Sequence, residues 1–283
     1  MKLAHLILAH NNPLQLERMV KRLYSPKAYI FIYLDLKADM KEFENICKLP
    51  NVQFIKNRIY VGWGNYSIIE ATLIGMKEIL ATGFNFSHIN LLSGNDYPLK
   101  SASEIEDYFF ANTGKTFMWY DKIFNDWPDG QVRMQHYSLA DYNFKGRYHV
   151  AKLLSKILPA RKLPENYVAY GRAQWLTITP ECASYVIDFI EKKSDFRRYF
   201  KMTWCVDEVF FQTILCNSPL AGTIVNDFRR YVLLDPGCKP ITLTMAHAED
   251  LISSGKFYAR KFDANIDSAI LDFLDTRSVR NVD

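Results

Sequence analysis

The chain has 283 residues, of which 49% are hydrophobic, 23% are charged and 14% are aromatic, and its formal net charge is +4. This length and composition are those of a soluble globular protein with a sizeable core, and they exclude a disordered or fibrous chain. The mild positive charge suits an anionic small ligand. The basic residues are scattered, which argues against a nucleic-acid-binding protein.

The five cysteines are odd in number and lie far apart, without a C-x-x-C pair. This spacing argues against a zinc site and a disulfide framework, and it fits a reducing compartment. The apolar run at the N-terminus is short and is interrupted by His5 and His10, so we expect a buried first strand there and not a signal peptide. Because no later stretch approaches the length of a membrane span, we expect a cytoplasmic protein.

Strand and helix signals alternate along the first third of the chain. Apolar runs predict strands at residues 3–9, 29–34, 52–55 and 86–92. Helical spacing predicts helices at 14–23, 40–47 and 66–80, the last with Ser67 and Glu70 placed as a capping box. This alternation predicts an α/β fold with a mostly parallel central sheet flanked by helices, in which ligands bind beyond the carboxyl ends of the strands.

The rest of the chain is less regular, above all between residues 119 and 163, which are rich in Tyr, Arg and Lys. We expect short strands at 175–177 and 241–244, and helices at 181–191 and 246–253. Apolar residues between 209 and 215 predict a further helix, with Asp207 and Glu208 in its first turn. No repeat, low-complexity tract or linker interrupts the sequence, which predicts a single domain over residues 1–283.

Polar groups follow three of the predicted strands. His10, Asp35 and the Ser-Gly-Asn-Asp turn at 93–96 come directly after the first, second and fourth strands. Carboxyl ends of parallel strands share an edge, so Asp35 is a candidate acceptor for hydrogen bonds from a ribose or a base; the alternative is a plain turn residue. Without a Gly-rich phosphate loop, P-loop and dinucleotide-binding interpretations are weak.

The adjacent carboxylates Asp207 and Glu208 lie beside Trp204 in an apolar run. A partly desolvated carboxylate at a helix start is a usable general base. The alternative is that Asp207 caps the helix and Glu208 is solvated. Glycosidases need two opposed carboxyl groups about 5–10 Å apart, and neighbours on a helix point in different directions, so this pair is a poor match for that role.

A pyrophosphate needs counter-charge from a metal or from fixed cations. Arg260 and Lys261 lie between aromatic residues and can provide such cations, although a solvated surface pair is the alternative. Further basic residues precede them at Arg229, Arg230 and Lys239. No histidine pair has metal-ligand spacing, and Lys37 stands where an Asp-x-Asp motif would have its second aspartate, which argues against a metal.

Seven motifs occur in an order that spans nearly the whole chain. They are AHNN at 9–12, IYLDLK at 32–37, VGWG at 61–64, LLSGNDYPL at 91–99, GRAQW at 171–175, WCVDE at 204–208 and FYARKFD at 257–263. This order resembles the core-2/I-branching β-1,6-N-acetylglucosaminyltransferase family, which also includes the protein xylosyltransferases. The absence of the family's usual anchor, stem and paired cysteines predicts a bacterial-type soluble member.

The resemblance implies a GT-A-like nucleotide-diphospho-sugar transferase fold that inverts the anomeric carbon without a metal or other cofactor. It implies that Glu208 is the general base and that Lys261 stabilises the departing UDP diphosphate. The family uses a second basic residue upstream to stabilise the diphosphate; here Lys239 is the nearest candidate, with Arg229 or Arg230 as alternatives.

The remaining positions fall into two sets. The implied donor contacts are His10, Asp35, Lys37, Trp63, Ser93, Gly94, Asn95, Asp96 and Arg260, and the candidate acceptor contacts are Arg133, Tyr137, Trp175 and Asp207. We expect residues 1–118 to form the nucleotide-sugar-binding half and residues 119–283 the acceptor-binding and catalytic half.

The sequence thus predicts an inverting, metal-independent transferase that moves GlcNAc from UDP-GlcNAc to a glycan hydroxyl in polysaccharide or glycoconjugate biosynthesis. A xylosyltransferase that uses UDP-xylose is the alternative within the family. A glycoside hydrolase and a non-catalytic glycan-binding protein are alternatives from other classes. The expected partners are the UDP-sugar and a glycan acceptor, and no nucleic acid is expected. A lipid-linked glycan is among the acceptors considered, and the enzyme would reach it through peripheral contact with the inner face of a membrane.

Overall fold

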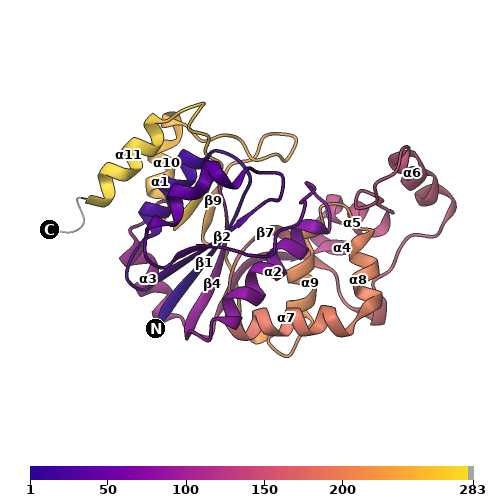
Figure 1. Cartoon of the computed structure of the whole chain (residues 1–283). Coiled ribbons are helices and arrows are strands. Elements are labelled where there is room, and N and C mark those ends of the chain that lie inside the picture. Colours follow the sequence, from indigo (N-terminus) through magenta and orange to yellow (C-terminus); the bar gives the residue numbers. More distant parts are fainter. Residues whose placement is uncertain (280–283) are drawn as a thin grey trace. The chain divides into compact units, whose positions relative to one another are not determined.

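The computed structural model describes residues 1–279, which form two compact units (Figure 1). Unit 1 comprises residues 1–54, 85–113 and 229 onward, and unit 2 comprises residues 55–84 and 114–228. Each unit therefore combines segments that are distant in the sequence. The chain enters unit 2 at residues 55 and 114 and returns to unit 1 at residues 85 and 229, and the expected division into donor and acceptor halves at residue 118 stays a prediction.

Unit 1 contains four parallel strands in the order β3-β2-β1-β4. They are β1 (Lys2–Ala9), β2 (Ala28–Leu34), β3 (Val52–Phe54) and β4 (Phe86–Ser93). The chain between them forms α1 (Pro13–Leu23) and the 3-10 segment η1 (Met40–Lys48), and α3 (Ala102–Ala111) packs against β4. β1, β2 and β4 are almost continuously buried, as their apolar runs require of parallel strands covered on both faces.

A second, three-stranded sheet in unit 1 has the order β5-β10-β9. β10 (Tyr258–Arg260) runs antiparallel to β5 (Asp96–Pro98) and parallel to β9 (Arg230–Val232). The predicted strand at 241–244 is not a strand, although Ile241 N donates to Leu233 O and Leu243 N to Lys261 O. The predicted helix at 246–253 is a 3-10 turn, η5 (Met245–His247), that leads into α10 (Ala248–Ser253).

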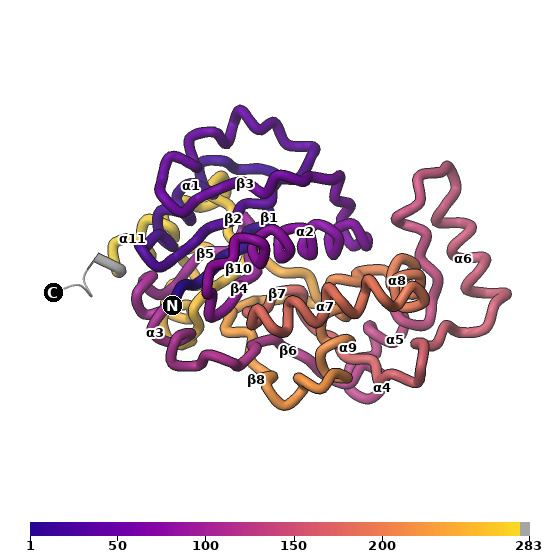
Figure 2. Tube along the Cα trace, turned by 60° about the horizontal axis from the view of Figure 1, so that its bottom comes forward, coloured from indigo at the N-terminus to yellow at the C-terminus, as the bar shows by residue number. Residues whose placement is uncertain are grey.

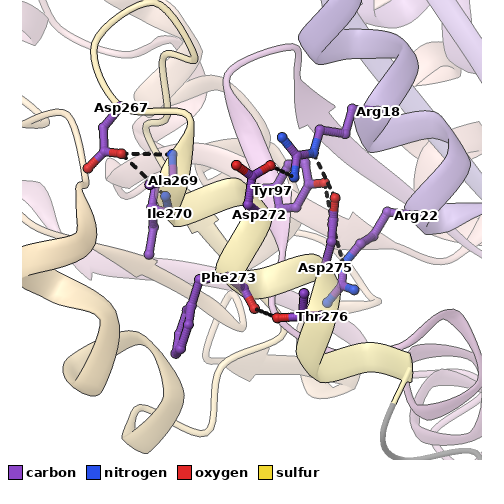
Figure 3. A network of polar contacts seen from close by, with 10 residues as sticks. All are labelled: Arg18, Arg22, Tyr97, Asp267, Ala269, Ile270, Asp272, Phe273, Asp275 and Thr276. Carbon is purple, nitrogen blue, oxygen red and sulfur yellow. Dashed lines mark hydrogen bonds and ion pairs between the residues drawn. The ribbon is translucent and has the colours of Figure 1, made fainter.

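The helix α11 (Ala269–Val279), which the sequence analysis did not predict, is held to α1 and β5 by a polar network (Figure 3). The Arg18 guanidinium on α1 pairs with Asp272 and Asp275, each at 2.7 Å. The Tyr97 hydroxyl on β5 donates to Asp275 Oδ1 at 2.6 Å, and Arg22 Nε lies 3.7 Å from the same oxygen. The basic side chains of α1 thus anchor the last described helix.

Unit 2 has three strands in the order β7-β6-β8. β6 (Thr116–Lys122) is antiparallel to β7 (Tyr170–Ile178) and parallel to β8 (Ile224–Asn226), and β7 is longer than the strand predicted at 175–177. α9 (Phe210–Cys216) packs on β7, and α7 (Pro180–Lys192) lies against both α9 and α2 (Ser67–Ala81) (Figure 2). With four parallel strands in unit 1, and with α3 against β4 and α9 against β7, the predicted α/β class with a mostly parallel sheet is confirmed.

The irregular middle of the chain forms short helices in unit 2. They are α4 (Ile123–Asp126), α5 (Pro128–Gln135), α6 (Arg147–Ile157) and α8 (Ser194–Lys201), with 3-10 turns at η2 (Pro164–Asn166) and η4 (Ala221–Thr223). In both views α6 lies on an extension beyond α5 and α8 (Figures 1 and 2).

Two further local predictions are wrong. Ser67 does not cap α2, because its Oγ accepts the Gly62 N–H at 2.9 Å; a capping box forms instead at Ser101 and Glu104, at the start of α3. The helix expected from Asp207 is divided: η3 (Val206–Glu208) is a separate 3-10 turn, and α9 starts after Val209, whose φ of −129° leaves helical geometry. Asp207 is therefore not the N-cap of α9.

Candidate functional site

Three strand ends meet at one edge of the four-stranded sheet in unit 1, as predicted. Ala9 lies opposite Leu34, and Leu8 opposite Ser93, so the residues that follow these strands share that edge. His10 is exposed there. The Asp35 carboxylate is buried and accepts the Lys37 N–H at 2.9 Å, with Lys37 Nζ at 3.5 Å. Their placement is confirmed, whereas their contacts with a donor stay predictions.

The turn after β4 is fixed by its own side chains and by β1. Ser93 N donates to Asp96 Oδ2, and Asn95 N donates to Ser93 Oγ, both at 3.0 Å. Gly94 N donates to Leu8 O at 2.9 Å, and Phe262 N donates to Asn95 O at 2.8 Å. The predicted donor loop is thus a rigid turn that is bonded directly to the segment after β10.

Asp96 and Arg260 face each other across the β5–β10 pair, with Asp96 Oδ1 3.5 Å from Arg260 Nε. Asp96 is buried. Burial raises the pKa of the Asp96 carboxyl, opposed by the nearby Arg260 guanidinium and the Ser93 N–H. Asp96 therefore positions Arg260, and its own buried carboxylate is poorly placed to contact a ligand.

The other arginines considered for the diphosphate are held by protein groups. Arg230 is buried, and its Nη2 donates to Asn90 Oδ1 at 2.6 Å and to Leu91 O at 2.9 Å. Arg229 donates to the Tyr108 hydroxyl and stacks on that ring, with 4.7 Å from the guanidinium carbon to the centroid. These contacts favour a structural role for both arginines.

The side chains of Lys261 and Lys239 are held by fewer protein contacts than those of the two arginines. Among residues 1–279 no carboxylate pairs with Lys261 Nζ, and the side chain is half-buried. The Lys261 N–H donates to Ile241 O at 3.4 Å, and the exposed Lys239 lies two residues before Ile241 in the turn closed by Asp235. Lys261 is thus hydrogen-bonded to the chain two residues after Lys239, and the diphosphate contact of both lysines stays a prediction.

Gln15 is a positioning residue that the sequence analysis missed. Its buried side chain donates from Nε2 to Gly94 O and Phe262 O, both at 3.1 Å, and accepts the Ala264 N–H at 2.7 Å. It joins α1 to the donor loop and to the segment after β10. The only sequence signal is a polar residue beside the apolar stripe of α1, which begins at Leu16.

In unit 2, Glu208 in η3 pairs with Arg133 in α5 through Oε2 and Nη1. Within residues 1–279, Glu208 Oε1 makes no hydrogen bond. Burial lowers the pKa of the Arg133 guanidinium, but the nearby negative groups, Glu208 foremost, together raise it above its ordinary value. The guanidinium carbon also lies 5.0 Å from the Trp127 ring centroid. Arg133 is thus a fixed cation that orients Glu208, a contact that residues 75 positions apart do not reveal in a sequence.

Gly171 in β7 explains why the GRAQW motif begins with glycine. A Cβ atom there would lie 2.7 Å from Glu208 O and 2.8 Å from both the Trp127 ring and Val209 Cγ1. The next residue, Arg172, pairs with Asp121 on the adjacent strand β6. Only glycine lets the η3 backbone approach β7 so closely, so this position sets where Glu208 lies.

The VGWG and WCVDE motifs form one structure. Gly64 has φ +69°, and a Cβ atom there would meet the Trp204 ring at 3.1 Å. Cys205 N donates to Gly64 O at 2.9 Å, and the Trp63 and Trp204 rings meet edge to face at 5.3 Å. Trp63 is 78% exposed, which leaves most of its ring free to contact a ligand. Trp63 belongs to unit 2, whereas the other predicted donor residues belong to unit 1.

A cleft of about 540 Å³ in unit 2 lies beside Trp204. Its walls are the segment that contains Tyr137 and the inner face of α6. Trp175, which was predicted to contact the acceptor with Tyr137, is buried in β7 and does not line the cleft. Asp207 is half-buried in η3 beside Glu208. Of the predicted acceptor residues, only Tyr137 lines this cleft.

The family model for the Core-2/I-Branching enzyme matches residues 3–252. Rat Xylosyltransferase 2 is 23% identical to this chain, and the match covers 97% of this chain and 33% of the relative. Xylosyltransferase oxt of Drosophila pseudoobscura pseudoobscura is 25% identical, and the match covers 91% of this chain and 31% of the relative. The crystal structure of mouse Xyloside xylosyltransferase 1, which covers 80% of this chain and 84% of its own, has a TM-score of 0.33 at 10% identity, too distant to bear on the fold.

The chain therefore belongs to the Core-2/I-Branching enzyme family, and the curated relatives that it matches are glycosyltransferases by name. It spans about a third of their length. Within residues 1–279, no group of three or more His, Cys, Asp and Glu side chains has an arrangement that could hold a metal ion. None of the described helices combines the length and apolar character needed to cross a bilayer.

Proposed function

We propose that this chain is a glycosyltransferase with a GT-A-like fold that moves a sugar from a UDP-sugar to a glycan hydroxyl, with inversion at the anomeric carbon and without a metal. The observation that carries the proposal is the Glu208 carboxylate, which Arg133 holds through Oε2 while Oε1 has no partner among the described residues. Family membership provides independent support.

The proposed reaction is a single displacement. The acceptor hydroxyl loses its proton to Glu208 Oε1 as its oxygen forms a bond to the anomeric carbon. The bond from that carbon to the diphosphate oxygen breaks, and UDP leaves with the electron pair. Arg133 holds Glu208 in one orientation, so that the base is in place when the acceptor binds.

The leaving diphosphate gains negative charge as the bond breaks, and this charge needs a fixed counter-charge. On unit 1, Lys261 has no carboxylate partner among the described residues, and Arg260 is positioned by Asp96. We infer that these two cations, with Lys239, take the role that a metal ion has in other transferases.

UDP-GlcNAc is the proposed donor, and UDP-xylose is an equally supported one, because the curated relatives are xylosyltransferases. The proposed acceptor is a glycan of a polysaccharide or glycoconjugate, including a lipid-linked one. The proposed location is the cytoplasm, at the inner face of the membrane.

The proposal is tested by thermal unfolding with UDP, UDP-GlcNAc, UDP-xylose, UDP-glucose and GDP, each with EDTA and with manganese. A ligand at 100 times its dissociation constant stabilises the folded state by about 2.7 kcal/mol. We expect UDP-sugars to stabilise the protein equally in EDTA, and Lys261→Ala to lose most of that shift. Lys41→Ala, a control at an exposed lysine of η1 in the same unit, should retain it. No shift with any uridine nucleotide would contradict the proposal and favour the hydrolase or glycan-binding alternatives.

A further inference from the structure

The segment around α6 has an unusual charge. Between Asp141 and Glu165 it contains six basic residues and no acidic residue, whereas the whole chain has a net charge of only +4. Arg161 is buried, and the other five lie at the surface: Lys145, Arg147, Lys152, Lys156 and Lys162. Among the described residues, no carboxylate pairs with any of these four lysines. The segment therefore presents uncompensated positive charge.

The same helix exposes an apolar stripe. Val150, Leu153 and Ile157 follow one another at i, i+3 and i+7, so they lie on one face of α6. They are 40%, 56% and 66% exposed, whereas Ala151 on the opposite face is buried. In a helix that packs on a core this stripe would face inward; here it faces away, on the extension seen in Figures 1 and 2.

Exposed aromatic and apolar residues flank the helix. Tyr142 and Phe144 are exposed before it, and Leu158 is exposed directly after it. Exposed aromatic rings beside lysines are typical of segments that lie at the boundary between lipid headgroups and acyl chains. Exposed apolar residues and unpaired lysines each occur singly on protein surfaces. Their combination on one protruding helix is not explained by the packing of unit 2.

We propose that α6 and its flanking turns dock on the surface of a membrane that contains anionic lipids. The stripe of Val150, Leu153 and Ile157 enters the headgroup region, and Lys145 and Lys162, which flank the helix and lie outside the cleft beside Trp204, contact lipid phosphates. The charge complementarity selects this partner, because a basic amphipathic helix gains from both the apolar phase and the negative surface potential of such a bilayer. A nucleic acid would use the charge and leave the stripe exposed.

The docking surface adjoins the cleft beside Trp204. Tyr148, Ala151, Lys152, Ser155 and Lys156 of α6 line that cleft, whereas the stripe lies on the outer face of the helix. If the proposed transferase function holds, a docked α6 places this cleft at the membrane surface, where a lipid-linked acceptor would present its glycan. This link rests on the proposed function; membrane docking itself does not.

The test is flotation of the full chain with vesicles of phosphatidylcholine alone and of phosphatidylcholine mixed with phosphatidylglycerol, at low and high salt. We expect binding to the mixed vesicles that weakens with salt. Leu153→Asp combined with Ile157→Asp, and separately Lys145→Glu combined with Lys162→Glu, should each reduce binding by about tenfold or more. Matched controls in unit 2 are Val168→Asp and the pair Lys122→Glu with Lys192→Glu, all at exposed positions, and these should bind as the unaltered protein does.

Several outcomes would overturn the docking proposal. The first is no binding to the mixed vesicles at low salt. The second is a loss of vesicle binding in the control variants equal to that in the test variants. The third is binding that the Leu153 and Ile157 substitutions leave unchanged. Light scattering adds one more: a dimer that these two substitutions dissociate would show that a second copy covers the stripe. The thermal shift with UDP-sugars is measured on the same variants, so failure of docking is distinguished from failure of the transferase proposal.

Discussion

Gly171→Ala is the sharpest test of how the fold positions Glu208. The added Cβ would lie 2.7 Å from Glu208 O and 2.8 Å from the Trp127 ring and Val209 Cγ1. Non-bonded carbon atoms pack best at about 3.5–4.0 Å, so something must move by roughly 0.5–1 Å. Trp127 and Val209 contribute side-chain atoms, but Glu208 O belongs to the backbone of η3, so the base moves with it.

A displacement of about 1 Å in a catalytic group can lower the rate by about 10²-fold. Overpacking of this kind costs about 1–3 kcal/mol of folding stability. We therefore expect the turnover number of Gly171→Ala to fall by about 10²-fold, with a lower melting temperature. Donor binding should change by less than about twofold, because Lys261 and Arg260 belong to the other unit.

The assay is UDP release with the donor found by thermal unfolding, run together with a direct measurement of donor affinity. Gly222→Ala is the matched control, because a Cβ atom at Gly222 in unit 2 would meet nothing within 4 Å. It should be as active and as stable as the unaltered protein. Normal turnover in Gly171→Ala would refute the argument that β7 sets the position of Glu208, and loss of donor binding together with turnover would indicate general unfolding.

Three further predictions concern single side chains. Arg133→Gln should lower turnover by about tenfold, because Glu208 loses the contact that orients it. The unfolding free energy measured by urea titration should change by less than about 1 kcal/mol, because the ion pair is partly exposed. A larger loss of stability would show that the pair has a structural role. Lys261→Ala should weaken the binding of UDP measured by calorimetry by about tenfold, and unchanged affinity would exclude Lys261 from the diphosphate contact. Burial, reinforced by a nearby arginine, lowers the pKa of His5 from about 6.5 to about 3, so this group stabilises the fold above pH 6.5 and that contribution is lost as pH falls toward 3. Between pH 7 and pH 5 the unfolding free energy measured with urea should fall by about 2 kcal/mol. In His5→Asn, which keeps a polar partner for Asn90, it should fall by less. An equal pH dependence of stability in both proteins would show that His5 is not the group responsible.

The strands that the sequence predicts best are those whose burial leaves little choice. β1, β2 and β4 are apolar almost throughout, and only a parallel sheet covered on both faces buries such runs. Their order then places Asp35 and the turn after Ser93 at one edge, which the register confirms. This part of the candidate site follows from local pattern and the geometry of parallel strands.

The errors occur where a distant contact overrides the local pattern. Ser67 has the spacing of a helix cap, but its hydroxyl accepts the Gly62 N–H instead. The helix expected from Asp207 is interrupted because η3 lies against β7 at Gly171.

The contacts that position the candidate groups are equally invisible to spacing. Arg133 meets Glu208 across 75 residues, and Gln15 meets Phe262 across 247. A single sequence carries the residue types for these contacts but not their pairing.

The most direct test of the central proposal is Glu208→Gln, which keeps the size of the side chain and removes its ability to accept a proton. UDP release with glycan acceptors and the affinity for the donor are measured on the same preparation. Our proposal predicts that turnover falls by about 10²–10⁴-fold while donor affinity stays the same. Turnover that persists in Glu208→Gln would show that Glu208 is not the base and contradict the proposed mechanism.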